Sequence, residues 1–129
     1  MDKPAPMISI VDDDPSVRRA LNRLVGSAGY LVETFASAGA FLDSAPSAAH
    51  TACLVLDIYL EGMTGFELQE RLEADRLAIP IIFMTAHDDA ATRERIRRSG
   101  AAGFLGKPFD GEALLDAILR VAGPAATGA

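Results

Sequence analysis

The sequence is poor in cysteine, in positive charge and in long apolar stretches. Its one cysteine, Cys53, excludes a disulfide framework and fits a reducing compartment. Because Cys53 lies within an apolar run, we expect a small core residue rather than a reactive thiol. A net charge of -6 argues against a nucleic-acid surface, which needs clustered Lys and Arg, so we expect no direct binding of nucleic acid.

No apolar stretch reaches the roughly 18 residues that a membrane-spanning helix requires. The chain also begins without the basic segment and apolar core of a secretory leader. We therefore expect a cytoplasmic protein without membrane contact. A chain of 129 residues is long enough for one domain that buries a core without disulfides or a structural metal.

Strand-like and helix-like segments alternate along the chain. Apolar runs predict strands at residues 7–11, 30–35, 52–58, 79–85 and about 102–107. A helix is predicted after each of these strands. Strands separated by helices pair in parallel through right-handed crossovers. The expected fold class is therefore α/β, a five-stranded parallel sheet with helices on both faces.

Residues that favour helix starts follow the strands. Asp14 and Pro15 are typical of the first positions of a helix, which Gly29 is expected to end. Thr64 and Glu67 have the spacing of a capping box. Further caps are expected at Ser37 before a short helix, at Asp88 or Asp89 before a helix closed by Gly100, and at Asp110 before the last helix.

The predicted helices offer unequal apolar faces to the core. The expected buried residues are Val17, Leu21, Leu24, Val25 and Ala28, then Phe41 and Leu42, then Phe66, Leu68, Leu72 and Leu77 (which lies near or beyond a helix end), and finally Leu114, Leu115, Ile118 and Val121. The helix at about residues 89–99 has only Ile96 and alanines among its charged residues. We expect this helix to be loosely held.

Four of the strands end in polar residues that suit chemistry. The first is followed by Asp12-Asp13-Asp14, and the others end in or before Asp57, Thr85 and Lys107. The carboxyl ends of parallel strands lie at one edge of the sheet, where ligands of open α/β sheets bind. A single Asp after a strand carries little weight, but the convergence of several strand ends predicts a functional site.

These motifs, in this order, resemble the receiver domains of two-component response regulators, the CheY-like family. The resemblance rests on Val11-Asp12-Asp13-Asp14, Leu56-Asp57, Gly62-Met63-Thr64-Gly65, Thr85-Ala86 and Lys107-Pro108-Phe109. It implies a flavodoxin-like (βα)5 sheet of order 2-1-3-4-5. It places the receiver domain at residues 7–122, between a flexible N-terminus, 1–6, and a flexible tail or linker start, 123–129. Phe35-Ala36-Ser37, Phe41-Leu42, Glu67-Leu68-Gln69 and Thr85-Ala86-His87-Asp88-Asp89 look closest to FixJ-like receivers, which usually precede a DNA-binding domain.

A divalent cation is expected among the acids, because like charges in one site raise one another's proton affinity unless a cation neutralises them. The resemblance implies Mg²⁺ (or Mn²⁺), held directly by Asp13 and Asp57, through water by Asp12, and by the backbone carbonyl of Tyr59. Oxygen ligands are those that Mg²⁺ prefers. Asp14 is expected to cap the first helix instead.

The resemblance implies that Asp57 is the phosphoacceptor. It would take a phosphoryl group from a sensor histidine kinase, a phosphotransfer protein or a small phosphodonor. Lys107 and Thr85 would stabilise charge on the phosphoryl oxygens. The domain would thus catalyse its own phosphorylation and dephosphorylation without turning over an independent substrate. The resemblance further implies a cis peptide bond between Lys107 and Pro108.

Signalling requires residues that change state, and the resemblance assigns this role to Thr85 and Phe104. The output face would then comprise the helix at 89–99, the fifth strand and the last helix. Tyr59 and His87, two residues beyond Asp57 and Thr85, are expected to tune the lifetime of the aspartyl phosphate. Phe104 equally fits an ordinary core residue, and Tyr59 and His87 equally fit loop residues.

The same sequence features bear on three other functions. Flavin or nucleotide binding is disfavoured because carboxylates stand where a phosphate cradle is needed. A metal-dependent phosphatase would carry an acid where Tyr59 stands. Leu60-Glu61 departs from the Met-Pro usual in receivers, which leaves a phosphorylation-independent interaction module as the alternative.

The chain is either a stand-alone receiver or part of a longer regulator, most simply of transcription, and phosphorylation-dependent homodimers are common in the family.

Overall fold

The computed structural model describes residues 5–44 and 49–125 and has alternating strands and helices. The elements are β1 (Met7–Val11), α1 (Pro15–Ser27), β2 (Leu31–Phe35), α2 (Ala38–Asp43), β3 (Thr51–Asp57), α4 (Gly65–Ala74), β4 (Ile81–Thr85), α5 (Ala90–Ser99), β5 (Gly103–Gly106) and α6 (Gly111–Ala122). Within these described residues, no helix is both long and apolar enough to cross a membrane. Residues 1–4 and 126–129 of the two predicted flexible ends lie outside the described residues.

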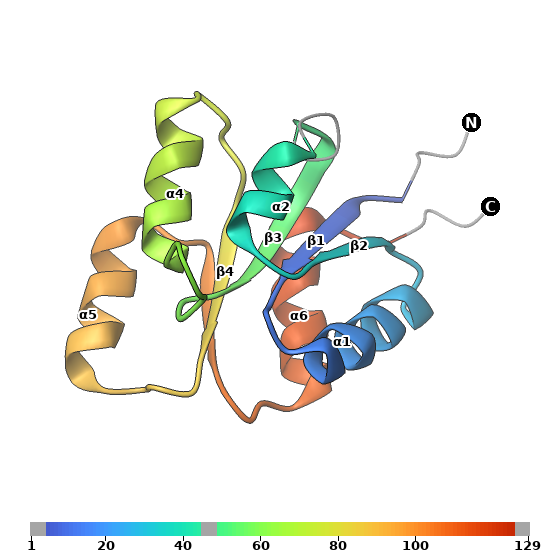
Figure 1. The fold of residues 1–129 in the computed structure, drawn as a ribbon. Coiled ribbons are helices and arrows are strands. Elements are labelled where there is room, and N and C mark those ends of the chain that lie inside the picture. The colour runs from blue at the N-terminus through green and yellow to red at the C-terminus, as the bar shows by residue number, and fades with distance from the viewer. Residues whose placement is uncertain (1–4, 45–48, 126–129) are drawn as a thin grey trace.

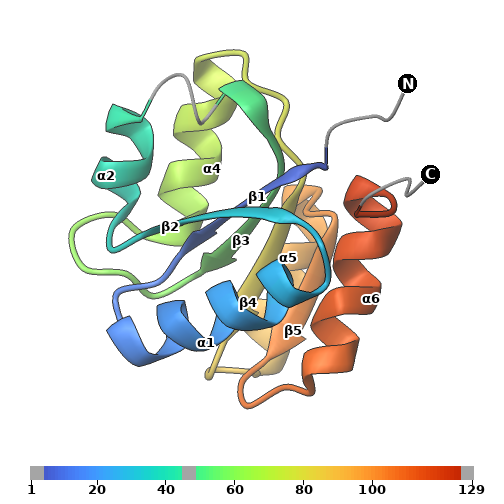
Figure 2. The same ribbon diagram turned by 90° about the vertical axis from the view of Figure 1, so that its right-hand side faces the viewer.

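The strands form one parallel sheet in the order β2-β1-β3-β4-β5, which confirms the predicted fold class. Strand β3 lies at the centre and is buried along nearly its whole length. Helices α1 and α6 cover one face, and α2, α4 and α5 cover the other (Figures 1 and 2). This double cover explains why the central strands read as continuous apolar runs.

Two apolar clusters fill the space between the sheet and its helices. The cluster under α2, α4 and α5 includes Phe41, Phe66, Leu72 and Phe83, and the cluster under α1 and α6 includes Leu21, Val25, Cys53, Leu114 and Ile118. Cys53 is fully buried, as expected, and burial raises the pKa of its thiol to about 12. Ala28, in contrast, is exposed, so its predicted burial is wrong: α1 ends at Ser27, and Ala28 is the C-cap residue beyond the helical stripe.

The helix starts follow the predicted caps. Asp14, Ser37 and Asp110 accept hydrogen bonds from the first-turn backbone of α1, α2 and α6, and of the two candidates before α5 it is Asp89 that does so. Thr64 and Glu67 form the complete capping box of α4. Gly65, the first residue of α4, donates its N–H to the Ile58 carbonyl, and a Cβ there would lie 2.9 Å from the Asp57 carbonyl oxygen. The lack of a side chain therefore lets α4 begin against the end of β3.

Candidate functional site

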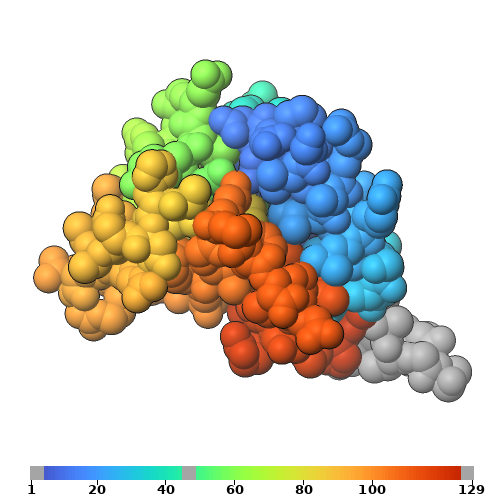
Figure 3. All heavy atoms as spheres, turned by 90° about the horizontal axis from the view of Figure 1, so that it is seen from below, coloured from blue at the N-terminus to red at the C-terminus, as the bar shows by residue number. Residues whose placement is uncertain are grey.

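The carboxyl ends of four strands bring the predicted polar residues to one edge of the sheet. Asp12 follows β1, Asp57 ends β3, Thr85 ends β4 and Lys107 follows β5. Because β1, β3, β4 and β5 are neighbours in the sheet, residues distant in sequence become adjacent. Figure 3 looks onto the underside of Figure 1, where blue, green, yellow and orange parts of the chain meet.

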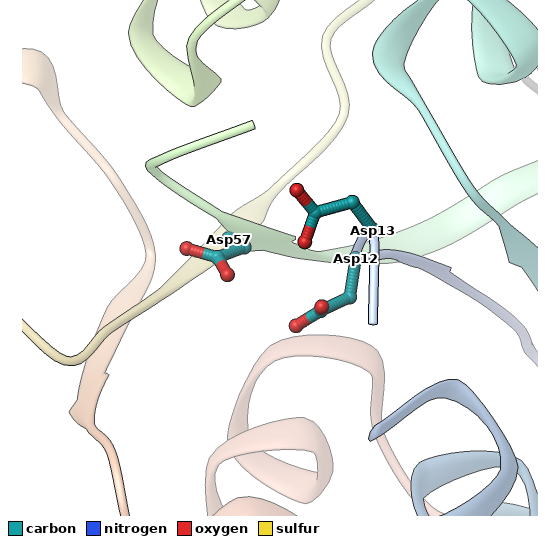
Figure 4. Close-up of side chains that lie close together, drawn as sticks. All are labelled: Asp12, Asp13 and Asp57. Carbon is teal, nitrogen blue, oxygen red and sulfur yellow. The ribbon is translucent and has the colours of Figure 1, made fainter. Parts of the chain in front are cut away.

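Three carboxylates gather at the ends of β1 and β3 (Figure 4). Asp12, Asp13 and Asp57 each offer an oxygen within 4.8 Å of the others. Asp12 is fully buried and Asp57 nearly so, whereas Asp13 is exposed. An all-oxygen set of carboxylates is the donor type that suits a hard divalent cation. Asp14 is not part of this set, because its carboxylate accepts a hydrogen bond from the Ser16 N–H (2.8 Å) and caps α1.

Lys107 joins two of the carboxylates. Its Nζ donates to Asp12 Oδ2 and to Asp57 Oδ2, each at 2.8 Å. Burial lowers the Lys107 pKa, but the hydrogen bonds to both carboxylates outweigh it, so the pKa is raised and the amine stays charged. Burial raises the pKa of Asp57, and the contact with Lys107 opposes that rise. The Lys107–Pro108 peptide bond is cis.

Every polar atom of Asp12 has a partner. Its N–H donates to the Phe35 carbonyl (3.1 Å), its Oδ1 accepts from the Asp14 N–H (2.9 Å), and its Oδ2 accepts from Lys107. Its carbonyl oxygen accepts from Arg18 Nη1 at 2.8 Å. The sequence did not predict a role for Arg18, because an arginine on a helix carries no signal that it returns to a backbone carbonyl of the preceding turn.

The residues two positions beyond Asp57 and Thr85 meet beside the site. The Tyr59 N–H donates to Asp57 Oδ1 (3.1 Å), and the His87 N–H donates to Thr85 Oγ1 (2.9 Å). The rings of Tyr59 and His87 pack edge to face with centroids 4.7 Å apart. The loops after β3 and β4 are therefore in direct contact through these two side chains.

Thr85 and Phe104, the two residues expected to change state, lie on the neighbouring strands β4 and β5. Thr85 is fully buried, and its carbonyl accepts from the Lys107 N–H at 2.7 Å. Phe104 is only partly buried and packs against the apolar cluster under α2, α4 and α5. Its register partner on β4 is Phe83, which is fully buried. The aromatic position on β5 is thus close to the core surface, with part of its side chain in solvent.

Comparison with known proteins agrees with this geometry. The family model of the response regulator receiver domain matches residues 8–119. The transcriptional regulatory protein FixJ of Bradyrhizobium diazoefficiens is 38% identical over 122 residues, which cover 92% of this chain and 59% of FixJ. The solved structure of the response regulator StyR has a TM-score of 0.82 and 47% identity, and covers 92% of this chain and 59% of StyR.

A third similarity is to a solved receiver of matching length. The response regulator receiver protein from Burkholderia phymatum has a TM-score of 0.81 and 41% identity, covering 95% of this chain and 99% of that one. The chain spans about half the length of the curated relatives it matches. The matched range spans the acidic residues, Thr85 and Lys107. The chain therefore belongs to the response regulator receiver domain family.

Proposed function

We propose that this domain is the phosphoacceptor of a two-component system and that Asp57 carries the phosphoryl group. An Asp57 oxygen attacks phosphorus while the P–N bond of a kinase phosphohistidine breaks, and the imidazole leaves with the electron pair of that bond. The observation that carries the proposal is the Asp57 carboxylate itself. It lies at the end of a buried strand, within 2.8 Å of the Lys107 ammonium and beside two further carboxylates.

The surrounding residues support this reaction in distinct ways. Lys107 places a fixed positive charge where the phosphoryl oxygens arrive, and Thr85 offers a hydroxyl from the neighbouring strand. Asp13 and Asp57 would hold Mg²⁺ directly, Asp12 through water, and the Tyr59 carbonyl would complete the protein ligands, as in the family. When bound, Mg²⁺ would neutralise charge on the acids and on the phosphoryl group.

Phosphorylation would be read out on the side of the molecule that carries β5. Thr85 moves towards the phosphoryl group, and Phe104, half exposed beside the core, turns inward. The gain for Phe104 is apolar burial alone, since its ring has no hydroxyl, and about 1.5 to 3 kcal/mol is its upper bound. The face formed by α5, β5 and α6 is the output surface in this proposal.

An apolar groove beside Lys107 supports docking of a phosphodonor protein. The groove has a volume of about 490 Å³ and is lined by α1 and by the segment after β5, with Leu21, Leu24, Pro108 and Phe109 among its residues. Lys107, whose amine contacts Asp57, also lines this groove. A helix of a histidine kinase or phosphotransfer protein, with an apolar face, would bring its phosphohistidine to the site from this side.

The downstream partner is proposed from the relatives. FixJ is named as a transcriptional regulatory protein, and this chain covers 59% of its length. We infer that the domain controls an effector of transcription, either in the same polypeptide or in a partner. Phosphorylation-dependent pairing of two copies through the output surface is one way to transmit the signal.

The decisive experiment is intact mass spectrometry after incubation with acetyl phosphate, with and without Mg²⁺. We expect a Mg²⁺-dependent gain of one phosphoryl group that is lost in Asp57→Asn. The matched control is Asp14→Asn, which changes a neighbouring acid outside the metal set to another good helix cap and should leave the gain intact. No gain with acetyl phosphate or with a phosphorylated kinase domain would refute the proposal and favour a phosphorylation-independent interaction module.

We propose that the Tyr59–His87 pair influences the lifetime of the phosphoryl group. The two rings contact each other beside Asp57 and are both exposed, so their bulk would limit the access of water or the His87 imidazole would position it. We expect the double substitution to alanine to change the rate of dephosphorylation, measured by the decay of the phosphorylated mass. An unchanged rate would leave these residues as loop residues without a role in turnover.

A further inference from the structure

Asp13 differs from the other two acids of the triad in how its carboxylate is held. Asp12 and Asp57 both accept from Lys107, and both accept a backbone N–H as well. The Asp13 carboxylate is exposed and accepts no hydrogen bond from the described residues. Its direction therefore depends on the backbone that carries it.

That backbone is held on both sides of Asp13. The peptide unit before it contains the Asp12 carbonyl, whose oxygen accepts a hydrogen bond from Arg18 Nη1 at 2.8 Å. The peptide unit after it contains the Asp14 N–H, which donates to Asp12 Oδ1 at 2.9 Å. Because peptide units are planar, fixing one atom of each restrains both dihedral angles of Asp13. Of these two ties, only Arg18 comes from outside the acidic turn.

We propose that Arg18 is a positioning residue for the metal site. Through the Asp12–Asp13 peptide it fixes the direction of the Asp13 carboxylate, which accepts no hydrogen bond from the described residues. The inference rests on the proposed function, since it concerns the cation expected between Asp13 and Asp57. Partners one step removed from the metal commonly affect affinity strongly, because they orient the ligands.

The charge of Arg18 and its positioning role have opposite consequences for metal binding. A guanidinium close to a cation site repels the cation, so removing the charge alone would strengthen Mg²⁺ binding. Removing the hydrogen bond to the Asp12 carbonyl frees the peptide before Asp13 and would weaken Mg²⁺ binding. The sign of the change therefore separates the two effects.

The test is isothermal titration calorimetry with MgCl₂ and no phosphodonor, on the wild type and on Arg18→Met. Methionine keeps an apolar stem and removes the N–H donors. We expect Mg²⁺ affinity to fall by about ten-fold. Arg19→Met is the matched control, because Arg19 is exposed, carries the same charge and, among the described residues, hydrogen-bonds only Ser16, at 3.4 Å. Its affinity should be unchanged or slightly higher.

Arg18→Lys is the second variant. It keeps the charge and an N–H donor but not the planar fork, so we expect an intermediate affinity, about three-fold below the wild type. If circular dichroism shows that Arg18→Met does not fold without metal, Arg18→Lys alone decides. Affinity unchanged or raised in the folded Arg18 variants would overturn the proposal, and so would a wild type that binds no Mg²⁺. A wild type that binds Mg²⁺ without gaining a phosphoryl group would refute the proposed function while leaving the role of Arg18 measurable.

Discussion

Helices α5 and α6 lie on opposite faces of the sheet beside the same edge strand, β5, but they are attached by different interactions (Figure 1). Helix α6 buries Leu114, Ala117 and Ile118 in the core. Helix α5 buries only Thr92 and Ile96. The hydrophobic effect is non-directional, so buried apolar side chains stabilise a helix even when it is slightly displaced. Polar contacts can be broken and replaced individually.

Helix α5 makes several polar contacts in addition to these two buried residues. Gln69 Nε2 donates to the Ser99 carbonyl at 3.1 Å, and Arg95 stacks over the Phe66 ring at 4.2 Å. Asp88 pairs with Arg93 through both carboxylate oxygens. In the switch proposed above, α5 would shift with the loop after β4, whereas α6 would keep its position on the sheet.

The largest effect is expected from truncating the apolar attachment of α6. Leu114→Ala leaves a cavity at a fully buried position and should cost about 2 to 5 kcal/mol of unfolding free energy. Urea unfolding measures this loss. Leu119→Ala on the same helix is the control, because Leu119 is 49% exposed and should have little effect. Equal losses in the two variants would contradict the contrast.

Hydrogen exchange should show directly that the backbone amides of α5 are less protected than those of α6. We expect the slowest amides of α5 to exchange at least about ten-fold faster than those of α6, a difference of about 1.4 kcal/mol in opening free energy. The measurement is native-state exchange followed by NMR on the unphosphorylated domain. Equal protection in the two helices would show that the polar ties hold α5 as firmly as the core holds α6.

Gln69→Ala removes the hydrogen bond from Gln69 to the Ser99 carbonyl and should therefore affect α5 and not α6. Gln69 is largely buried, and loss of its hydrogen bond should cost about 1 kcal/mol. Faster exchange is expected in α5 and unchanged exchange in α6. Glu70→Ala, an exposed neighbour on α4, is the control. An effect spread evenly over both helices would point to general destabilisation instead.

The smallest effect is expected from Asp88→Asn. The Asp88–Arg93 pair is exposed, so the midpoint of urea unfolding should not change measurably. Arg93 lowers the pKa of Asp88, so the pair is intact at neutral pH and is lost as pH falls through that lowered pKa. The protection factors of amides in the first turn of α5 should fall at acidic pH in the wild type, and should fall less in Asp88→Asn, where the capping residue Asp89 still titrates.

The fold was largely predictable because apolar runs and caps are local signals. The predicted third strand, 52–58, is found at Thr51–Asp57, one residue earlier. The fourth begins at Ile81 rather than at residue 79, since Pro80 has no N–H for the ladder. The gathering of Asp12, Asp57, Thr85 and Lys107 followed from parallel strands ending at one edge.

The hydrogen bonds made by the Gln69 and Arg18 side chains could not be predicted from the sequence. Gln69 and Ser99 are 30 residues apart, and Arg18 reaches a backbone carbonyl, which every residue possesses. Neither contact has a pattern of residue types or spacing. The expectation that the helix at 89–99 is loosely held came from its sparse apolar residues, and hydrogen exchange remains its test.

The double contact of Lys107 has a consequence for the charge of an ion that could bind at this edge of the sheet. Three carboxylates face one ammonium, so when all are ionised the site carries two more negative charges than positive ones. A divalent cation restores neutrality, whereas Na⁺ or K⁺ would leave a net negative charge for an incoming phosphoryl group to overcome. Lys107 would thus favour a divalent ion through this charge balance, in addition to the ligand preference set by the oxygens.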